Sequence, residues 1–352
     1  MQHYTFPYTE AFHCTAGDCP DSCCKGWEIV IDPKTLQTYQ QTCSPIGETI
    51  RSTLTKNEDD EWMFQNREDG NCPFWNAEKL CDLQIQAGEQ LLCDTCRQFP
   101  RIPQDYTLFT EHMLSLACPE AARLVLTQTE PFQAILLTQD EPSESINEAE
   151  LPYSLNWMNC LLETRAVLLQ LFQETSIPLA EALCYGLHYV QQFQDWIEEK
   201  TDNFPELQPI PSKPVFLHHE SVQHLYDTLE WMTPEWADWM QQIQQHPVTD
   251  ADLQAFTEIA EPLMPAFRNF CSYYLYLYWL QALNTGNALI QYQKLLAALH
   301  EIAIVSAWKL RETHTYTLTD CMIIVQRYAK EVMHDAENIE KIEDVLYNLG
   351  SL

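Results

Sequence analysis

Cysteine is crowded into the first third of this chain, and this crowding limits the possible folds more than any other feature. Ten of the 14 cysteines fall within the first 118 of the 352 residues. Cytosolic compartments keep thiols reduced, so thiols at this density are more typical of metal ligands than of disulfides. Cys23 and Cys24 are adjacent, and neighbouring cysteines rarely bond each other but can both face one metal from a tight turn. We therefore expect a metal-binding unit at the start of the chain.

The spacing of the cysteines narrows the kind of metal site. Cys93 and Cys96 form a Cys-x2-Cys pair, but no second cysteine pair or histidine pair follows at the spacing of a zinc finger. A proline directly follows Cys72 and Cys118. Dispersed thiolates of this kind suit an iron–sulfur cluster, and zinc is the alternative because four thiolates can hold either. The later cysteines are isolated in helical patterns and are expected to be buried thiols without a ligand role: Cys160, Cys184, Cys271 and Cys321.

The charge balance is strongly acidic along the whole chain. There are 51 acidic and 19 basic residues, a formal charge of −32, with 21 acids and 9 bases in residues 1–140 and 30 and 10 in residues 141–352. This balance disfavours nucleic acids and anionic membranes as partners. It favours a cationic partner, such as a lysine-bearing polypeptide. The alternative is that the acidic surface only keeps the protein soluble.

The chain lacks the usual signals for export, membrane insertion and nucleotide binding. Its start, MQHYTFPYTEAFHC, has neither the basic nor the apolar region of a signal peptide. The apolar run Tyr273 to Leu280 is much shorter than the ~20 residues that span a bilayer. There are only eight glycines and no GxGxxG string. We expect a soluble cytoplasmic protein that does not have a nucleotide-binding α/β fold.

Several blocks in the first third occur in the same order as in a known family. The blocks are FHC (12–14), DCPDSCCKGWEIVID (18–32), CPF (72–74), LCDL (80–83), TCRQFPR (95–101) and LACPEAAR (116–123). Together they resemble the bacterial flagellin lysine-N-methylase family, and such a co-linear set is more specific than any single motif. A wider relative is the zinc- or iron-chelating CxxCxxCC domain, which leaves the identity of the metal open. The first block departs from that pattern, with four and three residues between its cysteines.

The resemblance implies an enzyme that methylates the ε-amine of protein lysines with S-adenosylmethionine as donor, flagellin being the substrate that the family suggests. It also implies a [4Fe-4S] cluster, with zinc as the alternative metal. Eight cysteines within the blocks are the candidate ligands, more than one cluster needs, so we expect one cluster and allow a second site. They are Cys14, Cys19, Cys23, Cys24, Cys72, Cys81, Cys96 and Cys118. Cys43 and Cys93 lie outside the blocks and are expected not to ligate.

A second class of function stays open beside the enzyme. In that alternative the protein is a non-enzymatic zinc- or iron-binding scaffold that binds a cationic polypeptide partner. The ordered blocks favour the methyltransferase.

The hydropathy pattern predicts a mostly α protein in two parts. Residues 1–137 are expected to form a small, irregular α+β cysteine-rich domain, 138–150 a linker, and 151–352 an all-α helical domain. In the first part we expect strands at 27–32 and 105–115, a loop at 55–70, and helices from Pro33 and at 87–99 and 118–128. In the second part we expect helices at 153–172, 179–199, 220–232, 263–283, 289–311 and 319–349, and another after Thr249.

The densest aromatic segment suggests where a methyl donor binds. Tyr273, Tyr276 and Trp279 could surround the donor sulfonium and a lysine side chain through cation–π contacts, at the face where the cysteine domain meets the helices. The alternative is that these rings pack a helix–helix core with their polar tips at its edge. A lysine amine must lose its proton before it attacks a methyl group, but the many tyrosine and acidic side chains do not single out a base.

Overall fold

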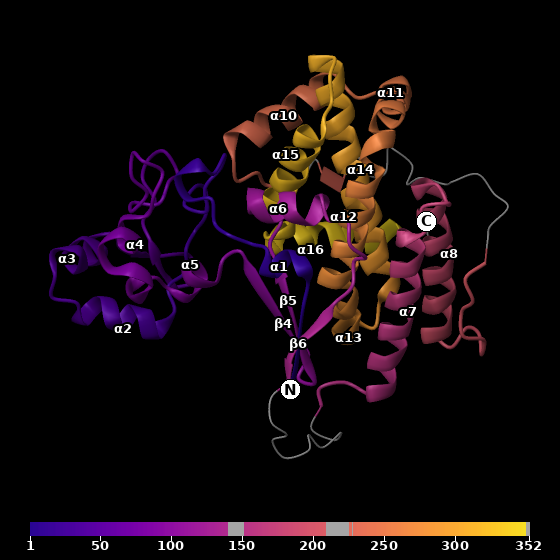
Figure 1. Ribbon diagram of the computed structural model, residues 1–352, viewed down its shortest axis with the longest axis horizontal. Helices are drawn as coiled ribbons and strands as arrows, with labels where there is room; N and C mark the ends of the chain where they lie inside the picture. Colours follow the sequence, from indigo (N-terminus) through magenta and orange to yellow (C-terminus); the bar gives the residue numbers. More distant parts are fainter. Residues whose placement is uncertain (140–150, 209–224, 227, 350–352) are drawn as a thin grey trace.

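The computed structural model describes residues 1–139, 151–208, 225–226 and 228–349. The expected fold class is confirmed, since the protein is mostly α with a small α+β part toward its N-terminus. Figure 1 shows the cysteine-rich segment on one side, the long helices on the other, and a small sheet between them. Among the described residues, no helix has the length and apolar character needed to cross a membrane.

The cysteine-rich segment is built from short elements. Asp32 begins the first of its helices as predicted, because its Oδ1 accepts a hydrogen bond from the Thr35 N–H at 2.8 Å. The predicted strand at 27–32 is wrong, since the only pairing there is an isolated bridge between Val30 and Met63. The predicted loop at 55–70 instead contains a β-hairpin. The elements are α2 (Pro33–Gln41), α3 (Pro45–Ser52), β2 (Leu54–Lys56), β3 (Trp62–Phe64), α4 (Asp82–Ala87) and α5 (Asp94–Gln98).

The small sheet has the strand order β4-β5-β1-β6. Its strands are β1 (Gln2–Thr5), β4 (Arg101–Asp105), β5 (Phe109–Leu114) and β6 (Ile135–Gln139). β5 lies within the predicted strand region 105–115 and pairs antiparallel with β4, which precedes that region. β1 runs parallel to β5, and β6 runs antiparallel to β1. β6 extends into the start of the predicted linker, and residues 140–150 of that linker lie outside the described residues.

Two hydrophobic cores divide the chain differently from the predicted domains. The smaller core lies within residues 29–96 and includes Tyr39, Phe64 and Phe74. The larger core contains the helices, but also Phe6, Tyr8 and residues 113–132. The sheet and the short helices α1 (Pro7–Glu10) and α6 (Pro119–Leu126) therefore pack with the helical part.

The helical part follows the predicted spacing but is interrupted at two places. The predicted helix 263–283 changes to a 3-10 turn at Trp279–Gln281, and the predicted helix 319–349 is broken by a π-helical turn at Ala329–Met333. Of the predicted helix 220–232, residues 220–224 and 227 lie outside the described residues, and residues 228–232 are not helical. The helices are α7 (Leu155–Gln173), α8 (Leu179–Ile197), α10 (Pro234–Gln245), α11 (Asp250–Ala260), α12 (Met264–Tyr278), α13 (Ala282–Thr285), α14 (Ala288–Thr313), α15 (Leu318–Tyr328) and α16 (Ala336–Leu349). α10 was not predicted, although Pro234 occupies its first turn.

A buried ion pair joins the sheet to the helices. Arg165 of α7 binds Glu111 of β5 with two hydrogen bonds, at 2.6 and 2.9 Å, and the side chains are only 7% and 3% exposed. The guanidinium carbon also lies 4.5 Å from the ring centroid of Tyr276 in α12. Each charge is thus compensated by a close partner in a region that water does not reach.

We predict that Arg165→Met lowers the free energy of unfolding by about 3–5 kcal/mol, because the Glu111 carboxylate would be left buried without its partner. Arg123→Met is the matched control, since Arg123 pairs with Glu120 on the surface and its loss should cost less than about 1 kcal/mol. Chemical denaturation of both variants measures the difference. Equal losses would contradict the role assigned to the buried pair.

Candidate functional site

Five of the predicted cysteines line one cavity, which we call the cysteine cavity. It has a volume of about 290 Å³ and is lined by Cys23, Cys24, Cys72, Cys81 and Cys96 together with Trp27, Ile29, Leu92, Phe99 and His334, among others. Thiols from four separate parts of the sequence thus share one largely apolar enclosure.

Backbone pairing brings these parts of the chain together. The Cys72 N–H donates to the Cys24 carbonyl at 2.8 Å, next to an isolated bridge between Lys25 and Asn71. Cys81 forms a second isolated bridge, with Trp75. These bonds satisfy the backbone polar groups of an irregular segment and at the same time fix the cysteines beside one another.

Hydrogen bonds join the Cys24 thiol to the thiols of Cys23, Cys72 and Cys81. Hydrogen bonding from Cys24 lowers the pKa of Cys23 to about 7 and that of Cys81 to about 6, and it also lowers the pKa of Cys72. Contacts with these three sulfurs raise the pKa of Cys24, whose single S–H can donate to one of them at a time. Three of the four thiols are thereby biased toward the thiolate, the form that binds metals.

The other predicted ligands, Cys96, Cys118, Cys14 and Cys19, do not all lie beside Cys24. Cys96 is hydrogen-bonded to Cys93, which is fully buried, so the structure brings Cys93 close to the cavity although the sequence analysis set it aside. Burial, with smaller contributions from the charges of Cys19 and Cys14, raises the pKa of Cys118 to about 11. Those three cysteines are therefore neighbours outside the cysteine cavity. Cys43 is exposed, and its thiol donates to the Gln41 carbonyl.

The described side chains are not arranged as the ligands of a bound metal ion. Within the described ranges, no group of three or more His, Cys, Asp or Glu side chains is arranged to hold a metal ion. The assignment of ligands therefore stays a prediction.

Polar contacts attach the cysteine-rich segment to the helical part. The Lys330 ammonium, from the π-helical turn, lies 3.0 Å from the Asp21 carboxylate and 6.0 Å from the centroid of the Trp27 ring. Burial raises the pKa of Asp21, but the Lys330 charge and several hydrogen bonds outweigh this, and the net pKa is lowered. Gly26 has a φ of 83°, and a Cβ atom there would lie 3.3 Å from Met232. The helical part thus contacts the chain on both sides of the Cys23–Cys24 pair.

His334 is a wall residue of the cysteine cavity that the sequence analysis missed. It follows the π-helical turn, and its Nε2 lies 2.5 Å from the Ser115 Oγ in a hydrogen bond. Burial lowers the pKa of His334 to about 4, so the ring is neutral at pH 7. Asp335 caps the next helix by accepting from the Asn338 N–H at 2.9 Å. An aspartate such as Asp335 is a common first cap of a helix, and this was the sequence signal that a new helix begins there.

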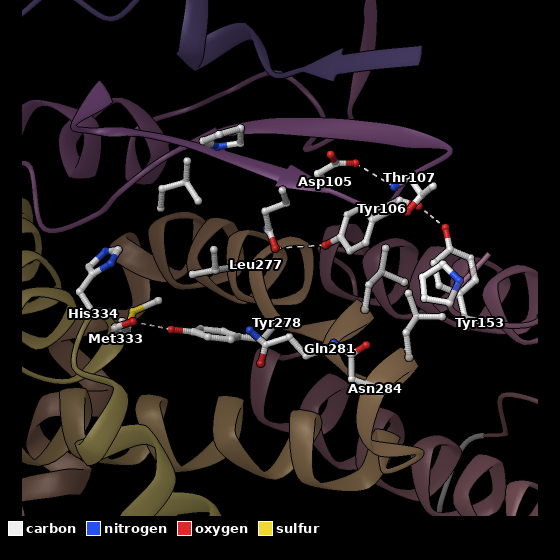
Figure 2. Close-up of a pocket in the computed structure, with 16 residues that line it drawn as sticks. Asp105, Tyr106, Thr107, Tyr153, Leu277, Tyr278, Gln281, Asn284, Met333 and His334 are labelled. Carbon is white, nitrogen blue, oxygen red and sulfur yellow. Dashed lines mark hydrogen bonds between the residues drawn. The ribbon is translucent and has the colours of Figure 1, made fainter. Parts of the chain in front are cut away.

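A second cavity, which we call the sheet-side cavity, lies between β4 and the turn from α12 to α13. Its volume is about 530 Å³. Figure 2 shows Asp105, Tyr106 and Thr107 above it, Tyr278, Gln281 and Asn284 below it, Tyr153 at one end, and Met333 and His334 at the other. His334 therefore lines both cavities.

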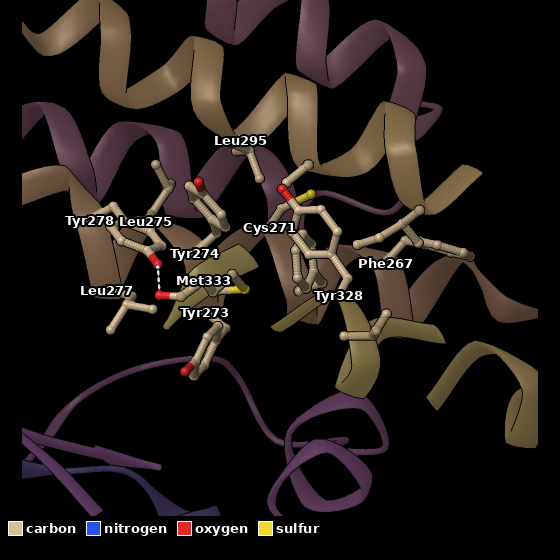
Figure 3. Close-up of a cluster of buried hydrophobic side chains, with 14 of the residues drawn as sticks. Phe267, Cys271, Tyr273, Tyr274, Leu275, Leu277, Tyr278, Leu295, Tyr328 and Met333 are labelled. Atoms are coloured by element: carbon tan, nitrogen blue, oxygen red, sulfur yellow. Dashed lines mark hydrogen bonds between the residues drawn. The ribbon is translucent and has the colours of Figure 1, made fainter. Parts of the chain in front are cut away.

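The three aromatic residues predicted to bind the donor lie inside the larger core. Tyr273 and Trp279 are 0% exposed and Tyr276 is 5% exposed. The Tyr273 hydroxyl donates to the Leu114 carbonyl, and the Trp279 Nε1–H donates to the Leu161 carbonyl. Figure 3 shows Tyr273 pointing away from Tyr274 and Tyr278, toward the N-terminal third of the chain. Neither of the two cavities is lined by these three rings, and their role in donor binding stays a prediction.

We predict that Cys81 of the metal-free protein reacts with iodoacetamide at pH 7 much faster than Cys118. Both thiols are half-buried, but Cys81 is mostly thiolate above pH 6, whereas Cys118 stays protonated until the pH approaches 11. Peptide mass spectrometry after labelling from pH 5 to pH 10 measures both profiles. Similar rates at pH 7 would contradict the thiol electrostatics described above.

Comparisons with curated proteins match about one third of the chain. The flagellar biosynthetic protein FliU of Salmonella muenchen is 34% identical over 120 residues, which are 33% of this chain and 71% of that protein. The lysine-N-methylase of Salmonella typhimurium is 33% identical over 124 residues, or 34% of this chain, and that of Salmonella choleraesuis is 34% identical over 120 residues, or 33%. The matches span only 31% and 30% of those two lysine-N-methylases.

No protein-family model and no solved structure matches the chain. The agreement with FliU nevertheless extends over more than two thirds of that relative. This chain belongs to the flagellin lysine-N-methylase family.

Proposed function

We propose that this protein is a protein-lysine N-methyltransferase that uses S-adenosylmethionine and holds a metal group in its cysteine cavity. The observation that carries the proposal is the convergence of five cysteines from the family blocks in one cavity that shares His334 with a second cavity. The names of two curated relatives, both lysine-N-methylases, support the choice of reaction.

The chemistry of the donor set fits an iron–sulfur cluster, with zinc as the alternative. Cys23, Cys24, Cys72 and Cys81 would hold the group, because their thiols already share hydrogen bonds and three of them have lowered pKa values. Four soft thiolates are the usual complement of a [4Fe-4S] cluster and of structural zinc. When bound, the group would supply cross-links between segments of a small core.

Methyl transfer requires that both cationic reactants reach the site and that the lysine is deprotonated there. The lysine ε-ammonium gives one proton to water, and the free amine then attacks the sulfonium methyl carbon to give a methylated ammonium. The C–N bond forms as the C–S bond breaks, and S-adenosylhomocysteine leaves as a neutral thioether. The charge of −32 draws both cationic reactants toward the protein, and apolar surroundings at the site would lower the pKa of the lysine.

The first test of this function is direct. The protein, purified without oxygen, is incubated with flagellin and S-adenosylmethionine, and lysine methylation is measured by mass spectrometry. We expect methyl-lysine on flagellin, and we expect binding of flagellin to weaken as salt is raised, because the attraction is electrostatic. Donor binding is measured in parallel by calorimetry. A protein that binds flagellin but neither binds the donor nor methylates lysine would be a scaffold, and the proposal would fail.

The second test concerns the metal. We predict that Cys24→Ser removes most of the bound iron or zinc and lowers the melting temperature of the cysteine-rich segment, while the larger helical core keeps its transition. Cys43→Ser is the matched control, since Cys43 is exposed and lies outside the cavity.

Elemental analysis, absorption spectra and calorimetric melting separate the outcomes of this second test. A colourless protein with only stoichiometric zinc would exclude the cluster. Unchanged metal content and melting in Cys24→Ser would exclude the cysteine cavity as the metal site.

A further inference from the structure

We infer that the sheet-side cavity binds the methyl donor, an adenosyl sulfonium, an assignment that rests on the proposed function. The donor-binding residues expected from the sequence do not line a cavity, whereas residues next to them along the chain, including Tyr278 and Gln281, line this one. The same aromatic segment thus contributes to a ligand site through its other residues.

The size of the cavity suits a nucleoside-sized ligand. Sites for small molecules of drug size have volumes of roughly 300–1,000 Å³, and this cavity has about 530 Å³. A lysine side chain alone, a four-carbon chain with one amine, would leave most of that volume unfilled.

The charges around the cavity favour a ligand with a positive centre. Asp105 is the only acidic residue among those that line it in the described part of the chain, and no lysine or arginine lines it there. The ammonium of Lys294 lies behind Gln281, 3.5 Å from its Oε1, but it is buried and paired with Glu343. A sulfonium at this site would therefore meet an unopposed carboxylate.

The remaining walls suit the rest of an adenosyl ligand. The half-buried Tyr106 and Tyr153 offer aromatic surface for an adenine ring, in the arrangement that Figure 2 shows. Gln281 and Asn284 add amide groups that can donate to a carboxylate or accept from an amine. Apolar residues, among them Leu277 and Leu280, complete the lining.

His334 places this ligand next to the cysteine cavity. Its ring lines both cavities and is held by Ser115 on one side and by Trp27, with ring centroids 6.2 Å apart, on the other. A donor in the sheet-side cavity would be separated by one side chain from a metal group bound by the thiols. The donor site and the metal site would then be adjacent, with His334 between them.

The first experiment fills the cavity. Asn284→Trp adds an indole at an exposed wall position, and we expect the Kd for S-adenosylmethionine in calorimetry to rise about tenfold or more. Thr285→Trp is the matched control, because Thr285 is the next residue of the same short helix, is equally exposed and does not line the cavity. We expect that variant to bind the donor as the unaltered chain does.

The second experiment tests the charge. Asp105→Asn should raise the Kd for S-adenosylmethionine about threefold, and leave the Kd for the uncharged-sulfur product S-adenosylhomocysteine unchanged. Asp69→Asn is the control, because Asp69 and Asp105 each accept a backbone N–H two residues on, at 3.1 and 2.8 Å, so both substitutions remove one charge from a similar turn.

The outcomes separate the cavity from the function. If the donor binds and methyl-lysine forms, but Asn284→Trp binds the donor as well as Thr285→Trp does, the cavity assignment is wrong and the proposed function stands. If a lysine peptide, and not the donor, loses affinity in Asn284→Trp, the cavity holds the substrate side chain instead and the assignment is again wrong. Absence of both donor binding and methylation in the unaltered protein overturns the proposed function together with this inference.

Discussion

The buried pair between Arg165 and Glu111 fixes the position of the sheet, and both cavities depend on that position. The Tyr276 ring lies against the guanidinium, and its backbone carbonyl accepts from the Gln104 side chain of β4 at 3.1 Å. α7, α12 and the β4–β5 hairpin are therefore held in one arrangement. A lone charge in this place would be very costly, so the three elements cannot separate without exposing the pair to water or leaving one partner uncompensated. The sheet-side cavity is the space that remains between β4 and the end of α12.

The interruptions of two helices matter as much as the helices themselves. Where α12 ends, the chain turns through Trp279–Gln281 and presents Gln281 to the cavity. Where α15 ends, the π-helical turn at Ala329–Met333 is followed by His334, which lines both cavities. Such turns are frequent at functional sites because they direct side chains differently from a regular helix. Lys330, within the π-helical turn, also contacts Asp21, so the same interruption holds the cysteine-rich segment.

Local patterns predicted the parts of this structure that local interactions decide. The cap at Asp32 and the spacing of the long helices are of this kind, and the cysteine blocks named five residues that line one cavity. The sequence analysis did not find the break before Asp335 or the partnership of Arg165 with Glu111, which are 54 residues apart. It left open whether Tyr273 and Trp279 pack a core or line a site, because aromatic residues in either role have the same composition, and the structure buries both rings. Long-range packing decides between the two, and helical periodicity carries no information about it.

The acidic surface and the proposed reaction make opposite demands on a substrate lysine. A field from 51 acidic side chains attracts the ammonium but also raises its pKa, which opposes the loss of a proton. The two effects act at different distances. Salt screens the effect of exposed acidic charges on the lysine pKa beyond about 10 Å, whereas burial of the lysine changes its pKa at the site itself. The sheet-side cavity has one carboxylate among phenols, amides and aliphatic side chains. A lysine drawn in by the distant charges would therefore lose water and approach a fixed positive sulfonium, and both effects lower its pKa where the amine has to react.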